Sequence, residues 1–66
     1  MDRAKIGERL RKLRGSRTQE EVADAIGITS AAISQYESGE RIPRDEIKKS
    51  LAEYYKRTVN YIFFSD

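Results

Sequence analysis

QEEVADAIGITSAAISQYES, residues 19–38, is the stretch that decides the fold of this chain. Its apolar side chains recur at helical spacing on either side of Gly27, as they do in amphipathic helices. We expect one helix over about residues 19–26 and a second over about residues 30–37, joined by a tight turn. The inner faces of these helices are formed by Val22, Ala23, Ile26, Ile33 and Tyr36.

The turn between the two helices carries the residues that such a junction requires. Ala23 is small enough to let the two backbones come close together. Gly27 ends the first helix, where a left-handed conformation would cost a residue with a Cβ roughly 1 kcal/mol. Ile28 then fills the corner, and the hydroxyl of Thr29 is placed to cap the second helix. The spacing indicates a helix-turn-helix over about residues 18–38, and spacing alone leaves an ordinary αα-hairpin open as the alternative.

The rest of the chain predicts three further helices and no strand. Apolar periodicity places one helix over about residues 3–14, one over about residues 44–56 and a short one over about residues 59–64. Thr18 and Glu21 have the spacing of a capping box at the start of the second helix. These elements predict a compact all-α fold of five helices.

Composition narrows what the chain can do. Its 66 residues, 1–66, make one small domain, and the absence of cysteine and histidine removes thiolate metal sites and the commonest general base. We therefore expect no cofactor, no bound metal and no enzymatic activity. No apolar run reaches the roughly 20 residues that a membrane span needs, so we expect a cytoplasmic protein without a membrane partner.

The formal net charge is only +2, but the charges are unevenly distributed. Residues 1–17 hold seven Lys or Arg against two acidic residues, whereas residues 18–38 hold four acidic residues and no Lys or Arg. A nucleic acid would therefore need its phosphates neutralised from outside the helix-turn-helix. Arg41 and Arg44, which follow its second helix, are the candidates, with the N-terminal helix contributing. A solvated helix face is the alternative for the N-terminal charges.

With its elements in this order, the chain resembles the Cro/repressor-type, lambda-repressor-like DNA-binding domains over nearly its whole length. The matching segments are IGERLR at 6–11, TQEEVA at 18–23, GIT at 27–29, ISQYESG at 33–39, Pro43 and VNYI at 59–62. The resemblance implies that the third helix enters the major groove of double-stranded DNA.

The resemblance also implies roles for individual side chains. It implies that four residues of the third helix, which lie away from its core face, point toward the bases. They are Ser30, Ala31, Ser34 and Gln35. For the phosphates the resemblance implies Gln19, to which we add Thr29, Arg41 and Arg44. Arg14 and Glu37 are implied to pair across the domain, and the alternative is an exposed pair worth under about 1 kcal/mol.

The side chains of the third helix predict something about the DNA sequence. A glutamine can pair with adenine through two hydrogen bonds, and an alanine methyl can pack on the thymine methyl. The helix has no Arg or Lys for the usual contact to guanine. We therefore expect half-sites richer in A·T than in G·C at the contacted positions. The alternative is that Ser30 and Ser34 are merely solvated and discriminate little.

Two departures from the family pattern concern the ends of helices. The connection over residues 14–18 is shorter than in many relatives, and Arg17 occupies a position where an apolar residue is usual. We expect this connection to be tight, which weakens any transfer of contacts from the relatives there. Lys56 lies at a helix end where glycine is frequent, which predicts a left-handed backbone at that residue.

The C-terminal residues 59–66 are too apolar for a short helix to bury all of them. Exposed apolar side chains often mark a contact, and symmetric operators require two-fold dimers. The candidates for a homodimer contact are Tyr61, Phe63 and Phe64. In the rival interpretation, Ile62 and Phe63 close the core while Phe64 frays.

Together these observations predict a sequence-specific transcriptional regulator, most simply a repressor that occupies an operator as a homodimer. The alternative from another class is a protein-partner module, such as an antitoxin or anti-repressor component with the same fold. The acidic helix-turn-helix and the aromatic tail favour the protein partner, whereas Gln19, Arg41 and Arg44 favour DNA.

Overall fold

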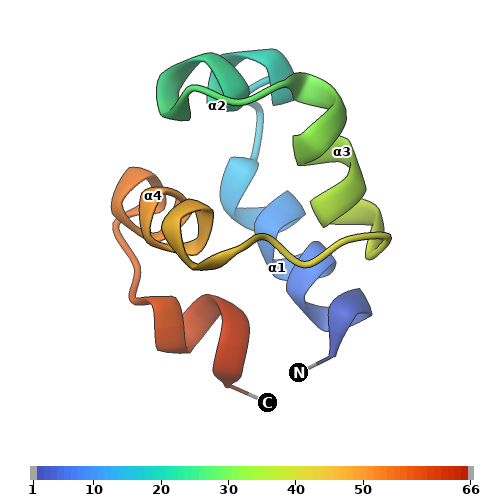
Figure 1. Ribbon diagram of the computed structural model, residues 1–66, viewed down its shortest axis with the longest axis vertical. Helices are drawn as coiled ribbons and strands as arrows, with labels where there is room; N and C mark the ends of the chain where they lie inside the picture. The colour runs from blue at the N-terminus through green and yellow to red at the C-terminus, as the bar shows by residue number, and fades with distance from the viewer. Residues whose placement is uncertain (1, 66) are drawn as a thin grey trace.

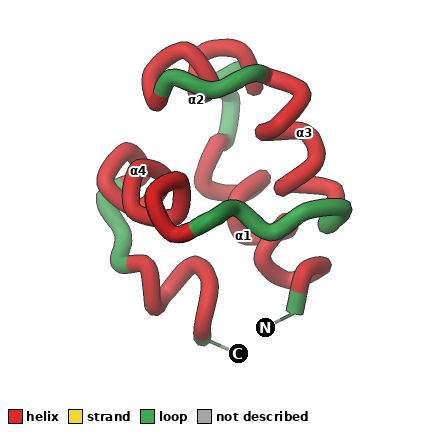
Figure 2. Tube along the Cα trace, viewed as in Figure 1, coloured by secondary structure: helices red, strands yellow, loops and turns green. Residues whose placement is uncertain are grey.

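The computed structural model describes residues 2–65, and within them every regular element is a helix (Figures 1 and 2). The elements in chain order are α1 (Arg3–Arg14), α2 (Gln19–Ile26), α3 (Ser30–Ser38), α4 (Asp45–Tyr55) and the π-helix η1 (Asn60–Phe64). In Figure 1, α2 crosses one end of the molecule, α3 descends along one side, and α4 and η1 occupy the other. The predicted all-α, five-helix fold is confirmed, with helix ends that differ from the prediction by no more than one residue. No helix in this part of the chain combines the length and apolar character needed to cross a membrane.

Side-chain caps define where the helices begin. Asp2 Oδ1 accepts the N–H of Ala4 at 3.0 Å at the start of α1. Thr18 and Glu21 form the expected capping box, in which the N–H of Glu21 donates to Thr18 Oγ1 at 3.0 Å and the Glu21 carboxylate accepts the N–H of Thr18. Each cap satisfies a backbone N–H that has no partner within its helix, which contributes about 1 kcal/mol. At the end of α4, Lys56 has a φ of 57°, the left-handed conformation expected there.

All five helices contribute to a single apolar core. Its buried apolar residues are Ile6, Leu10, Val22, Ala23, Ile33, Tyr36, Leu51, Ala52, Tyr55, Ile62 and Phe63. The inner faces predicted for α2 and α3 lie in this cluster, although Ile26 is only half-buried. The helices are thus held by burial of one face each, which is the main source of helix stability in a small domain.

The π-helix η1 divides its aromatic residues between the core and the surface. Ile62 and Phe63 are 0% and 1% exposed, whereas Tyr61 and Phe64 are 48% and 54% exposed. Arg9 on α1 donates from Nη1 to the carbonyl oxygen of Ile62 at 3.0 Å, which ties η1 to α1. The prediction of Phe63 as a dimer contact is therefore corrected, because its ring fills the interior and cannot reach a second chain.

Two cations lie against aromatic rings at the edge of this core. The guanidinium of Arg17 lies 5.2 Å and 5.4 Å from the ring centroids of Tyr54 and Tyr55, within range of a cation–π contact. Lys48 is only 8% exposed, and its Nζ lies 5.2 Å from the ring centroid of Phe64. Lys48 was not expected in the interior, since lysine is almost never fully buried.

α1 passes close to the backbone of α3 at Gly7. A Cβ at this residue would overlap the carbonyl oxygen of Glu37 and would lie 3.0 Å from the carbonyl oxygen of Tyr36. Both atoms belong to the backbone of α3, so neither can turn aside as a side chain could. Gly7 is required by this contact and was not identified as important from the sequence.

We expect Gly7→Ala to lower the free energy of unfolding by about 1–3 kcal/mol, because the added methyl overpacks two backbones that cannot separate locally. The midpoint of thermal unfolding would fall by roughly 4–8 °C per kcal/mol. Gly27→Ala is the matched control, since a Cβ there meets nothing within 4 Å and costs only the left-handed conformation. Circular dichroism during heating measures both variants, and a Gly7→Ala protein as stable as the wild type would contradict this account.

Candidate nucleic-acid interface

The turn between α2 and α3 has the geometry that its residues predicted. Gly27 is left-handed, with φ 79° and ψ 33°. The N–H groups of Gly27 and Ile28 both donate to the carbonyl oxygen of Ala23, at 2.9 Å and 3.0 Å. Thr29 Oγ1 then accepts the N–H of Ala32 at 3.1 Å and begins α3. The chain changes direction over a few residues and sets α3 across α2, as in a helix-turn-helix (Figure 1).

α3 has a distinct inner and outer face. Ile33 and Tyr36 point into the core and are 2% and 5% exposed. Ser30, Ala31 and Ser34 are exposed on the other side of the helix. These three predicted base-facing side chains are short and uncharged, so the helix backbone can come close to another surface there.

Gln35, the fourth predicted base-facing residue, is half-buried and already has a partner. Arg41 Nη1 donates to Gln35 Oε1 at 3.1 Å. The backbone N–H groups of Glu40 and Arg41 donate to the carbonyl oxygen of Gln35, at 3.0 Å and 3.3 Å. Gln35 and Arg41 therefore form one unit at the end of α3, a link between a base-facing and a phosphate-facing candidate that the sequence did not reveal.

Three of the four predicted phosphate-contacting residues line one hollow beside α3. The hollow has a volume of about 400 Å³ and is lined by Ile28, Thr29, Ala32, Tyr36, Arg41, Ile42, Arg44 and Ile47. It lies where two helices begin, since Thr29 is the N-cap of α3 and Arg44 that of α4. Helix N-termini present free N–H groups and a partial positive charge, and guanidinium groups bind phosphate oxygens in pairs. The arrangement is suited to an anion such as a phosphate group.

The fourth predicted phosphate contact, Gln19, lies outside this hollow at the start of α2. Its Nε2 donates to Glu37 Oε1 at 3.1 Å, so the side chain joins α2 to the last turn of α3. The backbone N–H of Gln19 is in the first turn of α2, where it has no partner within the helix. What Gln19 offers to a phosphate is therefore this N–H together with the second amide hydrogen.

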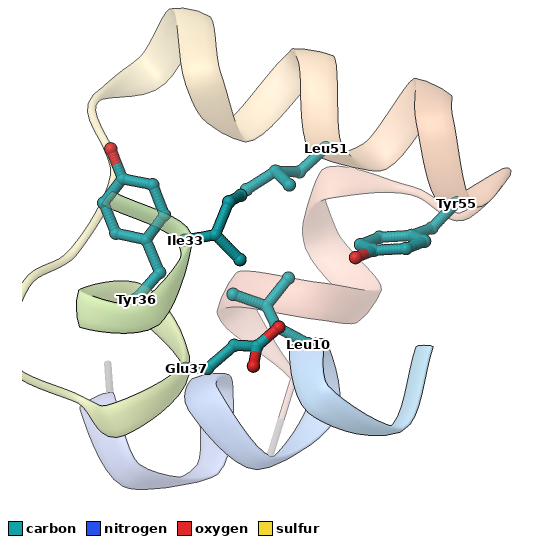
Figure 3. A pocket seen from close by; sticks show the side chains of 6 residues that line it. All are labelled: Leu10, Ile33, Tyr36, Glu37, Leu51 and Tyr55. Atoms are coloured by element: carbon teal, nitrogen blue, oxygen red, sulfur yellow. The ribbon is translucent and has the colours of Figure 1, made fainter. Parts of the chain in front are cut away.

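The carboxylate of Glu37 is a buried charge that joins α3 to α1 and α2 through hydrogen bonds. Its side chain is 4% exposed, and Arg14 meets it with two hydrogen bonds, Nε to Oε2 at 2.7 Å and Nη2 to Oε1 at 2.9 Å. Figure 3 shows the carboxylate turned inward beside Leu10. The surrounding side chains leave no space for a water molecule. The pair implied by the resemblance is present and partly buried, with Glu37 inside and Arg14 19% exposed, and is not the exposed alternative.

This environment raises two pKa values. The hydrogen bond to Glu37 raises the pKa of Arg14 above its ordinary value. Burial raises the pKa of Tyr55 to about 12, and the negative charge of Glu37 adds to the rise. The Tyr55 hydroxyl is turned toward the same interior space as the carboxylate (Figure 3). Tyr55 stays neutral and Arg14 stays charged well beyond neutral pH, so the carboxylate keeps its cationic partner and has no phenolate anion beside it.

The basic residues of the N-terminal segment divide between two roles. Three of them have partners within the molecule: Arg9, Arg14 and Arg17. Four others are exposed: Arg3, Lys5, Arg11 and Lys12. The segment is therefore not a purely solvated helix face. Nor are all seven of its cations available to bind phosphates.

Comparisons with known proteins point to the same arrangement of helices. A family model described as HTH_3, Helix-turn-helix, matches residues 8–62. Among solved structures, the P22 c2 repressor protein in complex with synthetic operator 9T, in the presence of Tl+, superposes on this chain with a TM-score of 0.87 and 28% sequence identity. The superposition covers 92% of this chain and 96% of that one. No curated protein matches the sequence.

We expect Arg14→Met to lower the free energy of unfolding by about 3–5 kcal/mol, because it leaves the Glu37 carboxylate buried without its cation. Glu37→Gln should cost less, since Arg14 is 19% exposed and can reach water. The double variant should therefore lose clearly less than the sum of the two single variants. Urea unfolding of all four proteins measures this coupling.

The matched control is Asp45→Asn, which breaks the 3.5 Å pair between Lys48 and the 97% exposed Asp45. The Lys48 side chain is only 10% exposed, but the Asp45 carboxylate is in water and the contact is long, so we expect its loss to cost under about 1 kcal/mol. Additive losses in the Arg14 and Glu37 variants, or an Arg14→Met cost no larger than that of Asp45→Asn, would contradict the buried-pair account.

Proposed function

Because the chain belongs to the helix-turn-helix family HTH_3, of the Cro/repressor type, we propose that it is a sequence-specific DNA-binding regulator of transcription. In this proposal α3 lies in the major groove, and the protein represses by occupying an operator as a homodimer. The proposal includes no catalytic step and no cofactor. The observation that carries it is the exposed outer face of α3 beside the hollow that holds Arg41 and Arg44.

The shape of α3 suits the major groove, which is about 12 Å wide and about 8.5 Å deep and admits one α-helix. Short side chains at Ser30, Ala31 and Ser34 let the helix come near the base edges. Serine hydroxyls can donate or accept there, and the methyl of Ala31 can pack on the thymine methyl. These residues support a preference for A·T over G·C pairs at the positions that they contact in each half-site.

Charge explains why the loop after α3 is needed. Residues 18–38 carry four acidic residues and no Lys or Arg, so the helix-turn-helix repels phosphates unless cations flank it. Arg41, which follows α3, and Arg44, at the start of α4, supply two guanidinium groups in the hollow beside α3. The P22 c2 repressor, which shares this fold and whose structure includes a synthetic operator, also supports DNA as the partner.

The exposed aromatic pair on η1 supports the homodimer. Tyr61 and Phe64 are the large exposed apolar side chains of the described residues. Each has a cation beside its ring, with Arg57 5.9 Å from the centroid of Tyr61 and Lys48 5.2 Å from that of Phe64. A second copy of the chain would cover both rings about a two-fold axis, as symmetric operators require. The same rings also favour the second candidate, a module that binds a different protein, such as an antitoxin or anti-repressor component.

Selection of duplexes from a random DNA pool near physiological salt tests the proposed function. We expect a palindromic consensus with half-site centres about 10–10.5 base pairs, or a multiple of that, apart. The logarithm of the binding constant should fall linearly with the logarithm of the salt concentration. Arg44→Ala should reduce the magnitude of this slope by about 0.9 without changing the consensus. Weak binding without sequence preference would overturn the proposal in favour of a protein partner.

We expect Phe64→Ser to weaken dimerisation about tenfold or more, because a buried phenylalanine ring contributes roughly 1.5–3 kcal/mol. Sedimentation equilibrium measures the association constant, and circular dichroism shows that the fold is kept. Ala25→Ser, at an exposed position of α2, is the control and should leave association unchanged. An unchanged association constant in Phe64→Ser would show that the rings do not form the dimer interface.

A further inference from the structure

Arg41 is held against the end of α3 in three ways, although its side chain is exposed. Its Nη1 donates to Gln35 Oε1 at 3.1 Å, and its backbone N–H donates to the carbonyl oxygen of Gln35 at 3.3 Å. Its guanidinium carbon also lies 5.9 Å from the ring centroid of Tyr36. A side chain that serves only a phosphate in the solvent has no need of a partner on the base-facing side of the helix.

The contact changes what Gln35 can present to a base. A free glutamine amide offers one acceptor and two donors, which is the pattern that pairs with N6 and N7 of adenine. When Oε1 accepts from Arg41, the amide is oriented with the Nε2 group as its free end. The positive charge beside Oε1 also repels the amino group at adenine N6, which would have to approach that same oxygen.

Most of the hydrogen-bonding capacity that this unit has left consists of donors, because the second lone pair of Gln35 Oε1 lies beside the positive charge of Arg41. Arg41 has further guanidinium N–H groups and no acceptor, and Gln35 adds the two hydrogens of Nε2. In the major groove, guanine presents two acceptors, N7 and O6, whereas adenine presents one acceptor and one donor. A surface of donors with a nearby positive charge matches guanine better than adenine.

We infer that Arg41 is a specificity-determining residue, which orients the amide of Gln35 so that the two side chains together select guanine over adenine. This inference rests on the proposed function and deepens it. It revises the A·T preference expected from α3 at one position of each half-site, the position read by Gln35. The preference assigned to Ser30, Ala31 and Ser34 is unaffected.

The test compares wild type with Arg41→Met, which keeps an unbranched apolar stem and removes the donors. The position read by Gln35 is identified as the one whose base preference is lost in Gln35→Ala. Affinities are then measured on two duplexes that differ only by a G·C or an A·T pair at that position. Wild type should prefer guanine by about tenfold, and Arg41→Met should lose this preference or turn it toward adenine.

Arg44→Met is the matched control, since Arg44 lines the same hollow but the hydrogen bond to Gln35 comes from Arg41. It should weaken binding to both duplexes by the same factor and keep the preference for guanine. If Arg41→Met behaves in that way too, or if wild type prefers adenine, the inference is overturned while the DNA-binding proposal stands. If wild type shows no sequence preference on any duplex, both are overturned.

Discussion

The last turn of α3 is fixed to the two preceding helices through Glu37, and the position of the helix-turn-helix depends on that residue. Its carboxylate accepts two hydrogen bonds from Arg14 on α1 and one from Gln19 on α2. Its backbone carbonyl lies against Gly7, so close that no side chain fits between the helices. A buried carboxylate without partners would cost several kcal/mol, and here three N–H groups and one positive charge offset that cost. α3 therefore cannot shift along α1 without breaking the ion pair and the backbone contact together.

Because α3 is held through its inner face, Ser30, Ala31 and Ser34 on its outer face remain exposed. The cations of the chain are divided accordingly. Arg14 and Arg17 act on the inner side, one against Glu37 and one over aromatic rings of α4. Arg41 and Arg44 lie in the hollow beside α3, where the proposed function places a phosphate. The small net charge of the chain therefore does not show that its cations form two separate groups, one in contact with the core and one beside the outer face of α3.

Sequence reasoning succeeded where the signal is local. The left-handed Gly27 and the cap at Thr29 each follow from the chemistry of one short segment, because the backbone needs a particular residue there. The left-handed Lys56 followed from the family pattern, in which glycine is frequent at that helix end. Sequence reasoning failed where two distant segments meet. Nothing near Gly7 indicates that the backbone of α3 lies over it, and nothing in the aromatic tail tells which of its rings points inward. Phe63 was named as a dimer candidate for that reason, with the core as the rival interpretation, and η1 turns it into the core.

By itself the sequence determined the helices, their caps and the turn between α2 and α3, since periodicity and capping act within about one turn of helix. Family resemblance added the pairing of Arg14 with Glu37. Only the tertiary structure decided how charged side chains are used. It placed Arg17 over tyrosine rings, buried Lys48 and joined Arg41 to the amide of Gln35. The physical reason is that a charged side chain is long and flexible, so its partner depends on which segments packing brings within its reach.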